Sequence, residues 1–179
     1  MSPLRPPVSD QDHIRGDPSA PVVLVEYGDF ECPYCADAYR VLKTLEARFG
    51  DRLCVVFRHF PLTQAHPHAA HAAEAAEAAG SCGRFWEMHD AIFEHRAALE
   101  DADLVRYAEA IRVPANVITD AWTNGRYAAR IRRDFLSGVR SGVNGTPSFF
   151  INDARYEGNY DVGSLSEAVE EELTARSKG

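Results

Sequence analysis

The chain has 179 residues, of which 45% are hydrophobic and 26% charged, so its core should be large enough to fold without cross-links. A net charge of −8 argues against a nucleic-acid-binding surface, and four cysteines are too few for a disulfide scaffold. No apolar run has the length of a membrane span. We therefore expect a monomer with no nucleic-acid or membrane partner.

The N-terminal residues 1–17 are rich in proline and charge, and they are predicted to form a flexible lead. They contain neither the apolar segment nor the cleavage site of a signal peptide, so the sequence as it stands indicates a cytoplasmic protein. A signal already removed would leave the same sequence. In that case the location would be periplasmic or otherwise extracytoplasmic.

The next segment predicts a strand, a helix and a second strand. Residues 22–27 are apolar on both faces except at Glu26, as expected inside a sheet. A helix is predicted over residues 32–49 from apolar side chains that recur every three and four residues, and residues 53–57 form the second strand. This succession predicts a right-handed βαβ unit.

The rest of the chain predicts a helical insert followed by a return to the sheet. Apolar periodicity places helices at residues 66–79, 85–93, 101–111, 114–123 and 127–139. Two short strands at residues 148–151 and 155–157 flank an Asn-Asp turn, and a final helix follows. We expect one domain from residues 18–63 and 141–179, with residues 64–140 as an inserted helical subdomain.

The motif Cys32-Pro33-Tyr34-Cys35 stands where the first helix begins. Two cysteines at this spacing can close a small disulfide ring, and the first sulfur faces unpaired N–H groups and the positive end of the helix dipole. Both effects favour the reactive thiolate, and such motifs have pKa values from about 3.5 to about 7. The sequence therefore predicts a thiol–disulfide redox centre.

The order of elements, with Cys-x-x-Cys after the first strand and Gly-Thr-Pro before the third, resembles the thioredoxin fold. The helical insert makes the chain similar to the DsbA-like family of disulfide oxidoreductases. The matching segments are residues 26–35, 57–62, 85–89 and 142–149. The resemblance implies an α/β thioredoxin-like fold (β-α-β, helical insert, β-β-α) and a protein disulfide oxidoreductase that needs no cofactor. Its partners would be protein thiols and disulfides, and an unknown thioredoxin-type or membrane-oxidase-type protein would recycle it.

The resemblance also implies roles for individual residues. Cys32 would be the exposed nucleophile and Cys35 the buried cysteine that resolves the mixed disulfide. Glu26 occupies the position of the family's buried acid. On physical grounds as well, a carboxyl in a dry strand has a raised pKa and can exchange a proton with Cys35.

Substrate binding is expected around the proline loop. The resemblance makes Pro147 the cis-proline beside the disulfide and Thr146 the residue whose backbone pairs with a bound peptide, with Pro33 and Tyr34 as further contacts. Two residues depart from the family's best-known oxidant, since Tyr34 replaces a histidine and Thr146 a valine. A strong oxidant stabilises its thiolate form, so both changes predict a milder one.

Other interpretations remain open. A Cys-x-x-Cys motif can be half of a zinc site, but no second ligand pair lies near Cys54 or Cys82, so no metal is predicted. These two cysteines are expected to be isolated, with a second disulfide as the alternative. Packing roles are favoured over a metal site for four histidines, namely His59, His66, His68 and His71. The rival functions are a glutathione-dependent transferase or isomerase of the same fold, and a metal-binding or holdase-type protein.

Overall fold

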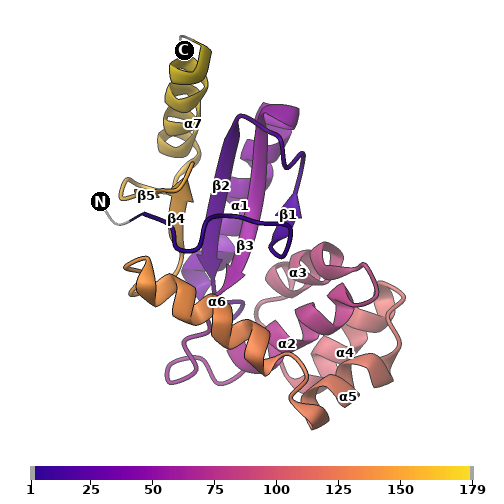
Figure 1. The fold of residues 1–179 in the computed structure, drawn as a ribbon. Coiled ribbons are helices and arrows are strands. Elements are labelled where there is room, and N and C mark those ends of the chain that lie inside the picture. The colour runs from indigo at the N-terminus through magenta and orange to yellow at the C-terminus, as the bar shows by residue number, and fades with distance from the viewer. Residues whose placement is uncertain (1–2, 178–179) are drawn as a thin grey trace.

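The computed structural model describes residues 3–177, which form a five-stranded sheet with helices on both faces and a helical lobe at one end (Figure 1). The strand order is β1-β3-β2-β4-β5. β2 and β3 are parallel, and the other neighbouring strands are antiparallel. The strands are β1 (His13–Arg15), β2 (Val22–Gly28), β3 (Leu53–His59), β4 (Ser148–Ile151) and β5 (Ala154–Tyr156).

Seven α-helices complete the described chain: α1 (Pro33–Phe49), α2 (Ala69–Gly80), α3 (Phe85–Glu94), α4 (Asp101–Ala110), α5 (Ala115–Asn124), α6 (Ala128–Arg140) and α7 (Val162–Ser177). Helices α2 to α5 form the lobe, and α6 runs from it back toward β4 (Figure 1). The predicted fold class is therefore confirmed, a thioredoxin-like α/β fold with a helical insertion. The division at residues 63 and 141 into a domain and a subdomain stays a prediction.

The alternation of side chains along β2 divides the core into two layers. Val22 and Leu24 pack against α1 and α7 on one face of the sheet. Val25 and Tyr27 belong to a second core, which the N-terminal segment and α6 cover. Since Glu26 lies two residues after Leu24, it points toward the face that carries α1.

Helix α1 begins directly at the cysteine motif. Cys32 is its N-cap residue and Pro33 occupies the first turn, where no intrahelical bond needs the missing N–H. Both cysteines also belong to the apolar core of the helical lobe, together with Phe30 and Met88. The insertion therefore packs directly against the start of α1.

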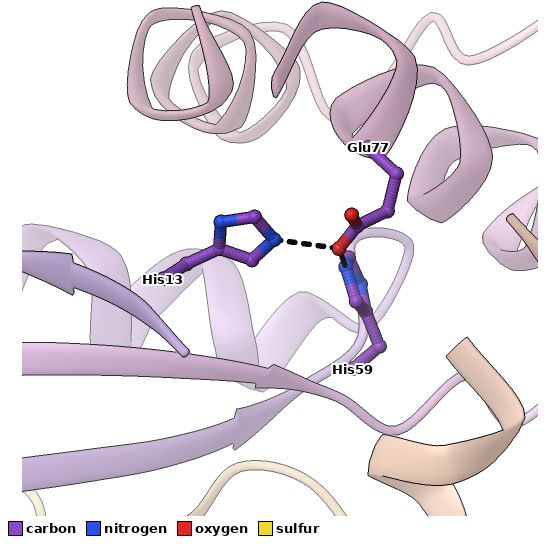
Figure 2. Close-up of side chains that lie close together, drawn as sticks. All are labelled: His13, His59 and Glu77. Carbon is purple, nitrogen blue, oxygen red and sulfur yellow. Dashed lines mark hydrogen bonds and ion pairs between the residues drawn. The ribbon is translucent and has the colours of Figure 1, made fainter. Parts of the chain in front are cut away.

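The N-terminal residues differ from the predicted flexible lead. Residues 1–2 lie outside the described part, but Leu4 is buried and β1 pairs with β3 along an edge of the sheet. His13 of β1 reaches Glu77 of α2, and the same carboxylate contacts His59 at the end of β3 (Figure 2). The strand is short and weakly apolar, so periodicity could not reveal it.

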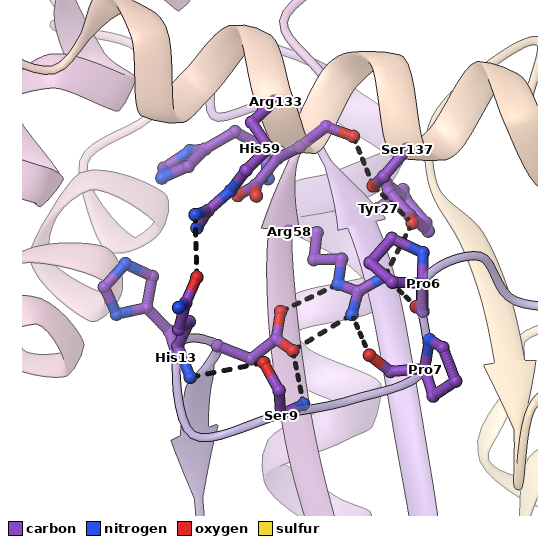
Figure 3. Close-up of polar contacts among 12 residues, drawn as sticks. Pro6, Pro7, Ser9, His13, Tyr27, Arg58, His59, Arg133 and Ser137 are labelled. Carbon is purple, nitrogen blue, oxygen red and sulfur yellow. Dashed lines mark hydrogen bonds and ion pairs between the residues drawn. The ribbon is translucent and has the colours of Figure 1, made fainter.

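A buried ion pair holds the N-terminal segment on the sheet. The Arg58 guanidinium donates to both carboxylate oxygens of Asp12, at 2.8 and 2.9 Å. It also donates to the carbonyl oxygens of Pro6 and Pro7 and to the Tyr27 hydroxyl (Figure 3). Only 3% of the Arg58 side chain and 7% of the Asp12 side chain are exposed, so water screens this pair weakly.

Candidate active site

The two motif cysteines lie beside the loop that precedes β4. The Cys32 thiol donates to the carbonyl oxygen of Thr146 at 3.5 Å, and the Thr146–Pro147 peptide bond is cis. The Cys35 sulfur accepts a hydrogen bond from the Asp29 N–H at 3.4 Å. Both cysteines are free thiols, so the structure represents the dithiol form.

The expectation of an exposed nucleophile is wrong for this structure. Only 3% of Cys32 and none of Cys35 is exposed. The Thr146 carbonyl lies against the Cys32 sulfur and the surrounding core encloses it, whereas the neighbouring Tyr34 side chain is 61% exposed. The Cys32 sulfur is therefore shielded from solvent, whereas the next residue but one in the motif is exposed.

The surroundings of Cys32 stabilise its thiolate. Interaction with the Cys35 thiol is the largest effect, and together with Thr146 and the backbone N–H groups of Tyr34 and Cys35 it outweighs burial. These contacts lower the pKa of Cys32 to about 5 from its usual value near 9.0. Cys32 is therefore ionised at neutral pH, as its place at a helix N-terminus predicts.

In contrast to Cys32, the side chains of Cys35 and Glu26 are stabilised in their protonated forms. Burial, the contact with Cys32 and the nearby Glu26 raise the pKa of Cys35 well above its usual value. Burial, followed by the Cys32 charge, raises the pKa of Glu26 to about 8. The Oε1 atom of Glu26 is buried, and no described residue hydrogen-bonds to it. At neutral pH one thiolate therefore lies near two protonated groups, one of which titrates close to neutrality.

A buried aspartate connects the cysteine motif to the loop after β3. Asp29 accepts hydrogen bonds from the Glu31 N–H and the Leu62 N–H, both at 2.8 Å. It also contacts Nδ1 of His66 at 2.7 Å. Although burial acts to lower it, the pKa of His66 is raised by Asp29 and by the Cys32 charge. Sequence reasoning missed both Asp29 and this role of His66.

A local signal for Asp29 was present in the sequence. An aspartate that accepts the N–H two residues later is typical of a turn just before a helix. Its contact with His66 spans 37 residues and depends on the loop after β3, which no local pattern specifies. The raised pKa of His66 favours its charged form near the thiolate, although position 34 of the motif carries a tyrosine.

The other two cysteines and the other predicted histidines make no hydrogen bond to the motif sulfurs among the described residues. Cys54 is buried in β3 and Cys82 is exposed after α2, and each is a free thiol. His68 and His71 contact acidic residues of the helical lobe. His59 instead joins His13 and Glu77, a grouping that the sequence interpretation did not include.

A thioredoxin-type sheet whose first helix begins at a Cys-x-x-Cys motif, with a helical insertion against it, places the chain in the class of thioredoxin-fold proteins. The family model described as Thioredoxin matches residues 8–171. The chain therefore belongs to the Thioredoxin family.

Solved structures with the same fold include a thioredoxin-like oxidoreductase and α-DsbA1. Oxidised BdbD from Bacillus subtilis superimposes with a TM-score of 0.83 at 21% identity, over 91% of this chain and 93% of that one. A thioredoxin-like oxidoreductase from Silicibacter pomeroyi gives 0.82 at 25% identity, over 93% and 94%. Wolbachia pipientis α-DsbA1 gives 0.81 at 20% identity, over 96% of each chain.

The curated relatives are named as Na(+)/H(+) antiporters, unlike the solved structures with the same fold. Na(+)/H(+) antiporter NhaA 1 of Salinispora arenicola is 46% identical over 169 residues, which are 94% of this chain and 25% of the relative. Na(+)/H(+) antiporter NhaA of Herminiimonas arsenicoxydans is 40% identical over 168 residues, 93% of this chain and 27% of the relative. The chain thus spans about a quarter of the length of these relatives. Within residues 3–177, every helix is too short or too polar to cross a membrane.

Proposed function

We propose that the protein exchanges disulfides with protein substrates, with Cys32 as the nucleophile and Cys35 as the resolving thiol. The observation that carries this proposal is the contrast between the two sulfurs of one motif. The pKa of Cys32 is lowered to about 5, whereas that of Cys35 is raised well above its usual value. One thiol is therefore ready to attack, and the other stays protonated until the mixed disulfide exists.

The reaction balances in two exchange steps. In substrate reduction, the Cys32 thiolate attacks one sulfur of a substrate disulfide, a mixed disulfide forms, and the other substrate sulfur leaves and takes a proton. Cys35 then loses its proton and attacks the Cys32 sulfur. The second substrate thiol is released, and the enzyme holds the Cys32–Cys35 disulfide and has given up two electrons. Substrate oxidation is the reverse of these steps.

The surface near the motif suits an extended polypeptide better than a small molecule. Pro33 and Tyr34 are exposed, and Thr146 and Pro147 are half-buried beside Cys32. The Leu62 N–H donates a hydrogen bond to Asp29, and the loop around Leu62 borders a shallow, mainly apolar groove of about 440 Å³. The groove is lined by Pro61, Leu62, Thr63, Gln64, Ala65 and Phe135. We assign these surfaces to substrate docking, with backbone pairing along the proline loop.

The direction of exchange depends on how strongly the thiolate is stabilised. A Cys32 pKa of about 5 lies between the values typical of such motifs, about 3.5 in a strong oxidant and about 7 in a reductant. We expect a reduction potential between about −270 and about −120 mV. Equilibration with glutathione buffers, followed by gel separation of thiol-alkylated forms, measures this value.

A variant of His66 tests whether thiolate stabilisation sets the reduction potential. The His66→Gln variant removes a cation near Cys32, so its reduced form should be less stable, the pKa of Cys32 higher and the potential more negative than in the wild type. His71→Gln is a matched control, because His71 pairs with Asp101 on the exposed surface of the lobe. Equal shifts of the Cys32 pKa and of the reduction potential in both variants would contradict this role of His66. A potential outside the stated interval would contradict the proposed intermediate oxidant.

Glu26 is proposed to move the proton of Cys35. Its carboxyl has a pKa of about 8, close to working pH, which suits a group that both accepts and returns a proton. Glu26→Gln should slow resolution of the mixed disulfide by about a hundredfold at neutral pH, the lower limit of the usual acid–base contribution. Stopped-flow fluorescence with a disulfide peptide measures this rate.

The pH dependence of stability tests the raised pKa of the buried Glu26 carboxyl independently of activity. The folded carboxyl keeps its proton up to about pH 8, whereas the unfolded one loses it near 4.5. The folded state therefore binds more protons in that interval, and the wild type should lose stability relative to Glu26→Gln as the pH rises through it. Glu109→Gln, on the exposed side of α4, should change neither property. An unchanged exchange rate in Glu26→Gln would remove the proton-transfer role.

The recycling partner is proposed by class only. A protein that reduces substrates needs a thioredoxin-type donor, whereas one that oxidises them needs an oxidase to accept the electrons. The antiporter names belong to proteins about four times as long as the matched region, so we do not assign ion transport to this chain. The measured potential decides between the two kinds of recycling partner.

A further inference from the structure

A cluster of three potential metal ligands lies where the sheet meets the helical lobe, outside the cysteine site. Nε2 of His13 lies 2.6 Å from Oε1 of Glu77, and Nε2 of His59 lies 2.8 Å from the same oxygen (Figure 2). The three ligand atoms are within 4.8 Å of one another. Two imidazole nitrogens from different strands therefore point at one position, which a helix carboxylate occupies.

In this cluster one carboxylate faces two imidazole rings, and the Glu77 side chain is only 7% exposed. The one cation nearby among the described residues, Arg130, lies 3.9 Å from Glu77 but also 3.6 Å from Asp134, which balances its charge.

We propose that His13, His59 and Glu77 bind a divalent transition-metal ion of the zinc type. Two imidazole nitrogens and one carboxylate oxygen form a common three-residue ligand set for Zn²⁺, and water completes a tetrahedral shell. The cluster is buried except at His13, whose side chain is 17% exposed and provides the path from solvent.

Metal binding requires a rearrangement of these side chains. Ligand atoms around a tetrahedral zinc ion lie about 3.3 Å apart, given metal–ligand distances of about 2.0–2.2 Å. The present distances from Glu77 to the two nitrogens are shorter, so the carboxylate must withdraw and the ion takes its place between the rings. Each imidazole then carries its proton on Nδ1. Among the described residues Nδ1 of His59 already lacks a partner, so this change removes no existing bond there.

The ion would join three segments that are distant in sequence. His13 belongs to the edge strand β1, His59 to the end of β3 and Glu77 to α2. Occupancy should therefore stabilise the docking of both the N-terminal strand and the helical lobe on the sheet. Since none of the three ligands bonds to either motif sulfur among the described residues, metal binding should be independent of disulfide exchange.

The test uses the full chain with the motif thiolates removed, since they can also bind zinc. A Cys32→Ser/Cys35→Ser variant should bind one Zn²⁺ per chain in competition with a chromophoric chelator, and its melting temperature should rise when Zn²⁺ is added. With Co²⁺ it should give visible tetrahedral bands and no sulfur-to-metal charge-transfer band. Adding His13→Gln should weaken binding by at least about tenfold, the lower limit for an outer-shell change at a metal site.

Controls separate this site from other ligands. His13 is the least buried ligand, so its loss should leave the fold intact by circular dichroism, and His71→Gln should leave the affinity unchanged. Glu77→Gln should also weaken binding if that variant folds. Failure of the Cys32→Ser/Cys35→Ser protein to bind stoichiometric Zn²⁺, or equal affinity with and without His13→Gln, would overturn the proposal. The cluster would then be only a hydrogen-bonded contact between sheet and lobe.

Discussion

The Cys32→Ser variant is expected to reduce insulin no faster than the dithiothreitol used to recycle it. Serine keeps the size of the side chain but cannot form a thiolate at neutral pH, so the attack on a substrate disulfide is lost. The wild-type environment, in contrast, lowers the pKa of Cys32 to about 5. The turbidity of precipitating insulin chains measures the rate, and circular dichroism shows whether the variant folds.

The Cys35→Ser variant is the matched control for the division of roles. It keeps the nucleophile and lacks the resolving thiol, so mixed disulfides with substrate proteins should accumulate and be visible on non-reducing gels. Cys82→Ser, at the exposed thiol after α2, should change neither activity nor trapping. Full activity in Cys32→Ser, or no trapped species in Cys35→Ser, would contradict the assignment. Turnover of glutathione with a small electrophile, insensitive to Cys35→Ser, would favour a transferase instead.

Removal of Arg58 should have the largest effect on stability. Arg58→Met leaves the Asp12 carboxylate buried without its partner and removes donors from Tyr27 and from the carbonyl oxygens of Pro6 and Pro7. Breaking one side of a buried ion pair costs about 3–5 kcal/mol, and we expect the free energy of unfolding to fall by that amount. Urea denaturation followed by fluorescence measures this change.

Two further variants distinguish the loss of the Arg58–Asp12 ion pair from a general loss of charge. Arg48→Met disrupts an exposed pair with Glu170, whose side chains are about half exposed, and should cost at most about 1 kcal/mol. Replacing both partners, in Arg58→Met/Asp12→Leu, should recover most of the lost stability because no charge is left buried alone. A loss below about 1 kcal/mol in Arg58→Met would mean that the N-terminal segment does not dock on the sheet in solution.

The N-terminal segment shows where local patterns fail. Its prolines and charges indicated a flexible lead, yet the charge of Asp12 is what Arg58 requires inside the protein. A polar residue is predicted to be exposed unless its partner is known. That partner is 46 residues away, on a strand whose second face the segment itself helps to cover.

The histidines also show that local sequence patterns do not predict contacts between distant segments. The sequence interpretation gave four histidines packing roles without naming their partners. The structure places His59 with His13 and Glu77, and it places His66 with Asp29. These groups arise because the loop after β3 and the helix α2 return across the end of the sheet. Spacing along the chain carries no information about that return.

The sequence by itself determined the helices, the strands of the central sheet and the position of the cysteine motif at the start of a helix. Apolar periodicity and turn residues are local properties, and they were enough for these features. Only the tertiary structure decided how buried Cys32 is, which charges surround it, and that the N-terminal residues belong to the sheet. Those properties depend on side chains that are far apart in the chain, and burial and electrostatic interactions are set by distance in space.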